Sequence, residues 1–175
     1  MTDSVLQGRR TRLRLLAPDD LPALADIARQ PGVQPWWTDT SEAGLRAALL
    51  DAPDTSSWAI IVDGGFAGAV SAYDLGWPPG TSVGLAIVLG DASQGRGLGP
   101  EALSVVIAHV ICERGVHRFT VDPAADNRRA IRAYEKLGFQ RVGVMRQSES
   151  APDGAWRDCM LMDLLAHDFI DYSED

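Results

Sequence analysis

The sequence predicts a single α/β (α+β) domain in which helices pack on a mixed sheet. The chain has 175 residues, of which 46% are hydrophobic and 23% are charged. These values are typical of one globular domain and unlike a disordered or fibrous chain. Short apolar segments with strand-like alternation are interleaved with segments of helical periodicity, which indicates a sheet with helices on it. The sequence therefore predicts that residues 1–175 form one domain.

The first three expected elements are a strand and two helices. Residues 12–16 alternate in polarity and predict an edge strand. An Ala-Pro-Asp-Asp sequence then supplies a capping signal for a helix over residues 21–29. Thr40-Ser41 is suited to cap a second, short helix that runs through Leu50. Residues 33–39 are left as an irregular connector between the two helices.

Three strands follow. Residues 58–62 and 66–73 flank Asp63-Gly64-Gly65, and this arrangement predicts a β-hairpin. Residues 83–89 form an apolar run bounded by Gly90-Asp91, which predicts a buried strand.

The second half continues with two helices and three strands. A glycine-rich turn precedes a helix over residues 100–114, with Pro100 expected at its first position. After a short strand at 118–121, Asp126-Asn127 opens a helix that ends near Leu137-Gly138. The last two strands are expected at residues 140–146 and 156–165.

The turn between the strand at 83–89 and the next helix carries the first chemical signal. Gly95, Gly97 and Gly99 let the backbone approach a ligand closely, and the free N–H groups at a helix start attract anions. The turn lacks the Gly-Lys-Ser/Thr ending of a P-loop, and no acidic residue on a following strand is placed to hold a ribose. The alternative is a turn that merely caps the helix.

The second signal is the segment from Asn127 to Phe139. At about 100° per residue, Asn127, Ala130, Ile131 and Tyr134 share one side of a helix, so Tyr134 points inward. A core tyrosine without a chemical role is the alternative interpretation.

Together these stretches resemble the GCN5-related N-acetyltransferase (GNAT) superfamily. Gln94-x-x-Gly97-x-Gly99 is similar to the family's pyrophosphate-binding pattern, and the family pattern N-x-x-A-x-x-x-Y-x-K-x-G-F is complete from Asn127 to Phe139. The order of the elements agrees along most of the chain. The resemblance implies a GNAT fold, with a mostly antiparallel sheet of six to seven strands, about four helices, and a splay between the fourth and fifth strands.

The resemblance also implies a site for acetyl-CoA between the two splayed strands. Its pantetheine arm pairs with the backbone of Val88 and Leu89, a backbone N–H near Val88 meets the oxyanion, and Tyr134 protonates the leaving thiolate. An amine attacks the thioester directly, without a covalent enzyme intermediate. The cofactor-binding residues it implies are Val88, Leu89, Gln94, Gly95, Arg96, Gly97, Leu98, Gly99, Asn127, Ala130 and Tyr134.

The acceptor is expected under the connector between the first two helices and beside the loop before the fourth strand. The candidate residues there are Trp36, Trp37, Asp39, Tyr73, Asp74 and Trp77, with Asp74 or Asp122 as acceptor of the amine proton. Either tryptophan has a packing role as its alternative, and either aspartate can be a solvated loop residue.

Two branches of the family suggest different acceptors. The stretches 32–37 and 153–162 resemble both the aminoglycoside 6′-N-acetyltransferases and the Rim-type enzymes that acetylate protein N-termini. The aminoglycoside enzymes tend to carry a carboxylate on the fourth strand, where this sequence has Ala86. A non-catalytic acyl-CoA-binding protein of the same fold is a third interpretation.

The composition limits the classes of partner and cofactor that we expect. A net charge of −8 argues against a nucleic-acid binder and favours a cationic partner such as a small-molecule amine or a peptide N-terminus. Cys112 and Cys159 do not form a disulfide framework, and His109, His117 and His167 lack metal-ligand spacing, so no metal is expected. Without an apolar span or leader, we expect a cytoplasmic protein with no membrane contact, as a monomer or homodimer.

Overall fold

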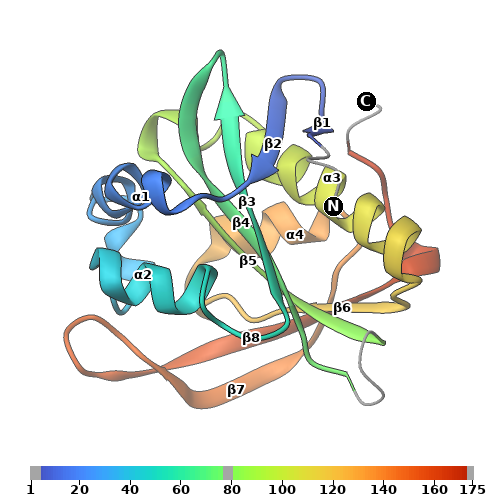
Figure 1. Cartoon of the computed structure of the whole chain (residues 1–175). Coiled ribbons are helices and arrows are strands. Elements are labelled where there is room, and N and C mark those ends of the chain that lie inside the picture. Colours follow the sequence, from blue (N-terminus) through green and yellow to red (C-terminus); the bar gives the residue numbers. More distant parts are fainter. Residues whose placement is uncertain (1–4, 77–80, 173–175) are drawn as a thin grey trace.

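One eight-stranded sheet forms the centre of the computed structural model, which describes residues 5–76 and 81–172 (Figure 1). Its strand order is β1-β2-β3-β4-β5-β6-β8-β7. The strands are β1 (Leu6–Gln7), β2 (Thr11–Leu15), β3 (Thr55–Val62), β4 (Gly65–Asp74), β5 (Ser82–Leu89), β6 (Arg118–Val121), β7 (Gln140–Ser150) and β8 (Trp156–Leu165).

In the described residues the sheet has eight strands, where six to seven were expected, and β2 is not its edge. The two-residue strand β1 folds back on β2 and pairs Leu6 with Leu13 and Gln7 with Arg12. A segment of two residues is too short to show a period, so the sequence carries no strand signal for it.

The sheet splays between β5 and β6, as the sequence predicted. Every other neighbouring pair is antiparallel, whereas β5 and β6 run parallel and pair only from Ser82 to Gly84 with Arg118 to Thr120. Beyond Gly84 the two strands diverge. The second half of β5 therefore keeps one edge that no strand in the described part of the chain covers.

Helices cover both faces of the sheet (Figure 1). The helices are α1 (Leu21–Ala28), α2 (Glu42–Leu49), α3 (Leu98–Arg114) and α4 (Arg128–Glu135), with 3-10 turns at Pro18–Asp20, Gln34–Trp36, Asp91–Ser93 and Ala166–Asp168. Trp58 and Ile60 of β3 pack toward α3 and α4, whereas Ala59 between them packs toward α1 and α2. The alternation of strand side chains thus builds two cores.

Local sequence explains where the helices begin. The Ser41 hydroxyl accepts a hydrogen bond from the Gly44 N–H at the start of α2, and the Asn127 side chain accepts one from the Ala130 N–H at the start of α4. Helix α3 begins at Leu98, two residues earlier than expected, because Gly97 adopts a left-handed conformation with φ 79° and ends the turn. Pro100 therefore lies third in the helix, still within the first turn where its missing N–H costs little.

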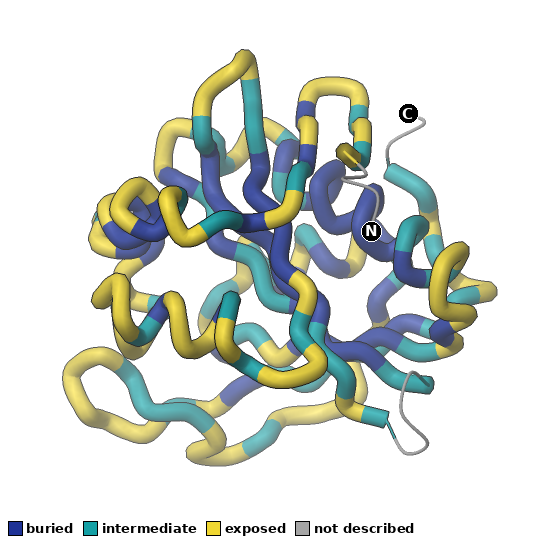
Figure 2. Tube along the Cα trace, in the orientation of Figure 1, coloured by how far each residue is buried: buried dark blue, intermediate teal, exposed yellow. Residues whose placement is uncertain are grey.

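Burial is concentrated in β3, β4, β5 and α3, whereas β7 is exposed along most of its length (Figure 2). The expected hairpin joins β3 to β4 through Asp63 and Gly64, both with positive φ, which is the geometry of a tight hairpin turn. None of the helices in residues 5–76 and 81–172 is long and apolar enough to cross a bilayer.

Candidate active site

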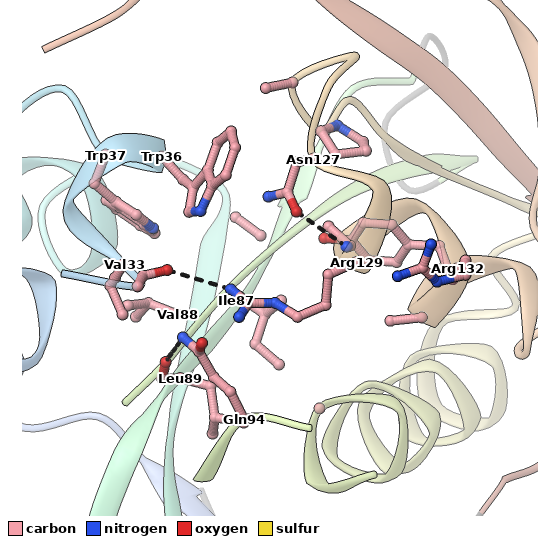
Figure 3. A pocket seen from close by; sticks show the side chains of 18 of the residues that line it. Val33, Trp36, Trp37, Ile87, Val88, Leu89, Gln94, Asn127, Arg129 and Arg132 are labelled. Atoms are coloured by element: carbon pink, nitrogen blue, oxygen red, sulfur yellow. Dashed lines mark hydrogen bonds between the residues drawn. The ribbon is translucent and has the colours of Figure 1, made fainter. Parts of the chain in front are cut away.

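A cleft of about 520 Å³ opens where β5 and β6 diverge (Figure 3). Its walls are the second half of β5, the glycine-rich turn before α3, the inner side of α4, the loop that follows β6, and the connector that holds Trp36 and Trp37. These segments lie far apart in the sequence. The splay of the sheet brings them together.

The free edge of β5 offers the backbone groups of alternate residues. The Ser82 carbonyl accepts from the Leu75 N–H, and the Gly90 N–H donates to the Ala67 carbonyl, so even-numbered residues of β5 bond to the β4 side. Val88 belongs to this set. The open edge is formed by Leu85, Ile87 and Leu89, and the prediction that the Val88 backbone faces the ligand does not fit this alternation.

The glycine-rich turn forms one wall of the cleft and leaves open space beside it. Gly95 and Gly97 have φ values of 73° and 79°, a region that other residues enter only under strain. A Cβ added at Gly95 or at Gly99 would meet no atom within 4 Å, so both glycines leave open space where they line the cleft. A diphosphate group fits this wall, because it combines free volume with the N-terminus of α3.

The structure separates the predicted cofactor residues into two sets. Those that line the cleft are Val88, Leu89, Gln94, Gly95, Gly97, Gly99, Asn127, Ala130 and Tyr134. Arg96 and Leu98 do not line it: the Arg96 carbonyl accepts a hydrogen bond from Arg10, and Leu98 is completely buried. The Asn127 side-chain oxygen is engaged in capping α4, so this residue shapes the wall by fixing the start of the helix.

Tyr134 points into the cleft from α4, as the helical periodicity predicted. Its side chain is buried and packs against Phe139 at a ring distance of 5.6 Å. Within the described residues no protein group hydrogen-bonds to its hydroxyl, and the oxygen is not sealed from solvent. Burial raises the pKa of this hydroxyl well above its usual range, and the charges of Asp122 and Tyr73 add to the shift. The group is therefore neutral and able to donate a proton.

Of the predicted acceptor residues, the structure brings Trp36, Trp37 and Asp122 to the cleft. Asp74 lies elsewhere: it pairs with Arg114 at 3.2 Å and accepts from the Gly76 N–H. Asp39 faces the start of α2, where hydrogen bonds from Ser41 lower its pKa. Trp77 lies outside the described residues.

Asp122 and Glu149 are the two carboxylates among the described residues that line the cleft. Asp122 lines the cleft, and desolvation raises the pKa of its carboxyl group. The charge of Glu149 raises that pKa further. In the described part of the chain Asp122 forms no ion pair, so a cation in the cleft finds a carboxylate that is not neutralised.

Glu149 and Arg157, which no sequence motif pointed to, also line the cleft. They face each other across β7 and β8, with an Arg157 Nη2 to Glu149 Oε2 distance of 3.0 Å. Arg157 also donates to the Pro35 carbonyl, and its guanidinium lies over the Trp36 ring at 5.8 Å. The β7–β8 hairpin thus holds the tryptophan connector in place. Cross-strand pairing around the Ala-Pro-Asp-Gly turn is the signal that could have found this pair.

Metal binding and nucleophilic catalysis by cysteine find less support in the geometry of the described residues. No group of three or more His, Cys, Asp or Glu side chains in residues 5–76 and 81–172 is arranged to hold a metal ion. Cys112 is exposed on α3, and Cys159 is buried, where desolvation raises the pKa of its thiol. A raised pKa keeps the thiol protonated and unreactive.

Comparison with known proteins agrees with this geometry. The family model described as "Acetyltransferase (GNAT) domain" matches residues 10–140. The aminoglycoside N(6′)-acetyltransferase type 1 of Klebsiella pneumoniae is 29% identical over 160 residues, covering 81% of this chain and 78% of that protein.

Two solved structures superpose along nearly the whole chain. A protein of T. thermophilus does so with a TM-score of 0.81 at 28% identity, covering 96% of this chain and 92% of that one. RimJ of Mycobacterium smegmatis, solved in complex with CoA-disulfide, gives a TM-score of 0.81 at 21% identity, covering 94% and 88%. At that identity the likeness to RimJ concerns the fold. With three quarters of its length matched by the family model, the chain belongs to the GNAT acetyltransferase family.

Proposed function

We propose that this protein is an acetyl-CoA-dependent N-acetyltransferase whose acceptor is a primary amine. The observation that carries the proposal is the cleft itself: the open edge of β5, the glycine-rich turn and the Tyr134 hydroxyl meet in one cavity of about 520 Å³. Acetyl-CoA, when bound, supplies the activated acetyl group as a thioester.

We assign each residue a role from its position in the cleft. The turn from Gln94 to Gly99 receives the diphosphate, and the N–H groups of Ile87 and Leu89 on the open edge pair with the pantetheine arm and face the thioester oxygen. Tyr134, held neutral by burial, donates a proton to the departing thiolate. Asp122 accepts the proton that the attacking amine loses, directly or through water.

The acceptor that the site favours is a small polycationic amine of aminoglycoside type. Trp36 and Trp37 offer flat apolar faces to a sugar ring, while the carboxylate of Asp122 attracts ammonium groups. The similarity to the Klebsiella pneumoniae enzyme supports the same class. Ala86, which lines the cleft on β5, removes the strand carboxylate typical of those enzymes, so the charge for the amine comes from the opposite wall.

A protein N-terminus is the second candidate acceptor. It is favoured by Ala86, which stands on β5 where the aminoglycoside enzymes tend to carry a carboxylate. A protein that binds acyl-CoA without transferring the acyl group is the third. The three candidates differ in what they bind and turn over, so one pair of measurements separates them.

The first measurement is calorimetric titration with acetyl-CoA and with CoA, where we expect binding at micromolar concentration. The second is release of free thiol from acetyl-CoA in the presence of two amine panels: aminoglycosides and polyamines in one, short peptides with free N-termini in the other. Turnover in the first panel supports the proposal, and turnover confined to peptides replaces it with the Rim-type activity. Binding without turnover in either panel identifies a non-catalytic protein, and no binding at millimolar concentration overturns the family function for this chain.

A further inference from the structure

A buried carboxylate fastens the start of the sheet to helix α3. Glu101, with 3% of its side chain exposed, accepts hydrogen bonds from four donors. These are the Arg10 N–H at 2.7 Å, the Thr11 N–H at 2.8 Å, the Thr11 hydroxyl at 3.0 Å and the Arg10 Nε at 3.1 Å. The bonds join residues about ninety positions apart in the chain.

The turn between β1 and β2 is shaped around this carboxylate. A Cβ at Gly8 would lie 2.7 Å from the Glu101 Oε1 and 2.5 Å from the Thr11 Oγ1, so only glycine leaves room for the carboxylate here. The Gly8 N–H donates to the Thr11 carbonyl at 2.8 Å and closes the turn. Arg10 is therefore presented to α3 in a fixed position.

Arg10 uses a second nitrogen to reach the glycine-rich turn. While its Nε bonds to Glu101, its Nη1 donates to the Arg96 carbonyl at 2.9 Å. Arg10 itself does not line the cleft, whereas Gly97, the residue after Arg96, does. The Arg96 carbonyl thus points away from the cleft.

Because the peptide unit between Arg96 and Gly97 is planar and trans, the contact that holds the Arg96 carbonyl also sets the direction of the Gly97 N–H. The C=O of one residue and the N–H of the next point in opposite directions across the planar peptide bond. Because Arg10 holds the Arg96 carbonyl outward, the Gly97 N–H is directed toward the cleft. The Tyr172 hydroxyl also lies close to Gly97, since it would be 3.2 Å from a Cβ on that residue.

We propose that Arg10, anchored by Glu101, is a positioning residue that fixes the peptide between Arg96 and Gly97 so that the Gly97 N–H faces the phosphates of the acyl donor. This inference rests on the proposed binding of acetyl-CoA in the cleft. The role needs the fork of a guanidinium, since one planar group must serve a carboxylate and a carbonyl at the same time. A lysine ammonium keeps the charge but not this geometry.

The test compares three variants by calorimetric titration with CoA. Arg10→Met keeps the side-chain stem and removes both contacts, and we expect the Kd for CoA to rise roughly fivefold to tenfold. Arg14→Met is the matched control: Arg14 lies in β2, is similarly exposed, and pairs with Asp20 at 2.7 Å on the side of α1. We expect it to lower the melting temperature at least as much and to leave the Kd within twofold of the wild type.

Arg10→Lys separates positioning from simple charge attraction. If Arg10 positions the peptide, Arg10→Lys binds CoA about as weakly as Arg10→Met. Should Arg10→Met prove too unstable to titrate, Arg10→Lys alone carries the comparison with the wild type and with Arg14→Met.

Hydrogen–deuterium exchange at saturating CoA gives a second readout. We expect protection of residues 94–99 to be weaker in Arg10→Met than in the wild type and Arg14→Met, since the Gly97 N–H is no longer held toward the ligand. Equal Kd values in Arg10→Met and Arg14→Met, or wild-type affinity in Arg10→Lys, would overturn the positioning role. Absence of CoA binding to the wild type would instead overturn the proposed function.

Discussion

The side-chain amide of Gln94 donates a hydrogen bond to the carbonyl oxygen of Leu89 at 2.7 Å, joining the glycine-rich turn to the last residue of β5 (Figure 3). This bond occupies the carbonyl at the end of the open edge. A ligand that pairs with this edge therefore finds the Leu85 and Ile87 groups and the Leu89 N–H available, and Gln94 lies where this edge meets the glycine-rich turn.

Replacing Gln94 with glutamate tests this junction. In Gln94→Glu the carboxylate cannot donate to the Leu89 carbonyl, and it adds a negative charge beside the site proposed for the diphosphate. We expect CoA affinity to fall about tenfold or more and stability to fall by about 1 kcal/mol. Gln30→Glu is the control, because Gln30 lies outside the cleft and uses its side-chain oxygen as an acceptor from the Asp91 N–H, a role that glutamate keeps. CoA affinity that falls equally in both variants would point to net charge alone.

Two glycines with the same backbone geometry separate ligand contact from strain. Gly95 has φ 73° and lines the cleft, whereas Gly64 has φ 79° in the β3–β4 turn, and a Cβ at either meets no atom within 4 Å. Gly95→Ala and Gly64→Ala should each cost about 1 kcal/mol of stability, because alanine is strained in the left-handed region. Only Gly95→Ala should also weaken CoA binding, by calorimetric titration. Unchanged CoA affinity in Gly95→Ala would remove this turn from the phosphate site.

Tyr134→Phe keeps the buried ring and removes the hydroxyl. We expect turnover to drop about 10²-fold, as is typical when general-acid help is lost, while the Kd for acetyl-CoA stays unchanged. Because the pKa of Tyr134 is raised, the wild-type enzyme should lose no turnover to ionisation of this tyrosine up to about pH 10, the reference pKa. A rate profile measured to that pH checks the second point. Wild-type turnover in Tyr134→Phe would leave the residue a packing role.

Glu101 makes the fold sensitive to acid. Burial raises the pKa of Glu101, but the hydrogen bonds from Arg10 and Thr11 outweigh it and hold the pKa below its usual value. The unfolded chain therefore binds the proton more readily, so this stabilisation is present above about pH 4.5 and is lost as the pH falls through the folded pKa. Glu101→Gln should cost about 2 kcal/mol at pH 7. In urea unfolding from pH 7 to pH 3, the difference from the wild type should shrink as the pH falls, and a constant difference would assign the effect to packing.

The order of the elements and the side of the cleft that is formed by the glycine-rich turn and Tyr134 follow from local sequence. The Asn127 cap, the positive φ at Gly97 and the inward face of Tyr134 each depend on residues within one or two helical turns, and the predicted motifs contain them. Contacts of this kind can be predicted from the sequence because the two partners lie close together along the chain.

The parts that could not be predicted depend on long-range pairing. Arg157 contacts Pro35, 122 positions away, and Glu149 faces Arg157 only because the register of β7 shifts between Met145 and Glu149. The expected strand ended at residue 146, before the pairing resumes, because a β-bulge interrupts the alternation that marks a strand. The sequence therefore did not predict that Glu149 and Arg157 line the cleft.

The wall formed by Trp36 leads to the last prediction. Trp36 lines the cleft under the guanidinium of Arg157, whereas Trp156, the residue before Arg157 in the sequence, is 65% exposed and does not line the cleft. If an indole face holds the acceptor, Trp36→Ala should raise the KM for the amine about tenfold, since a stacked aromatic contact contributes about 1 kcal/mol or more. The KM for acetyl-CoA should stay within twofold. Trp156→Ala removes the same side chain from the surface and should change neither constant, so an equal rise in amine KM in both variants would show that the indole at position 36 supports the fold and not the acceptor.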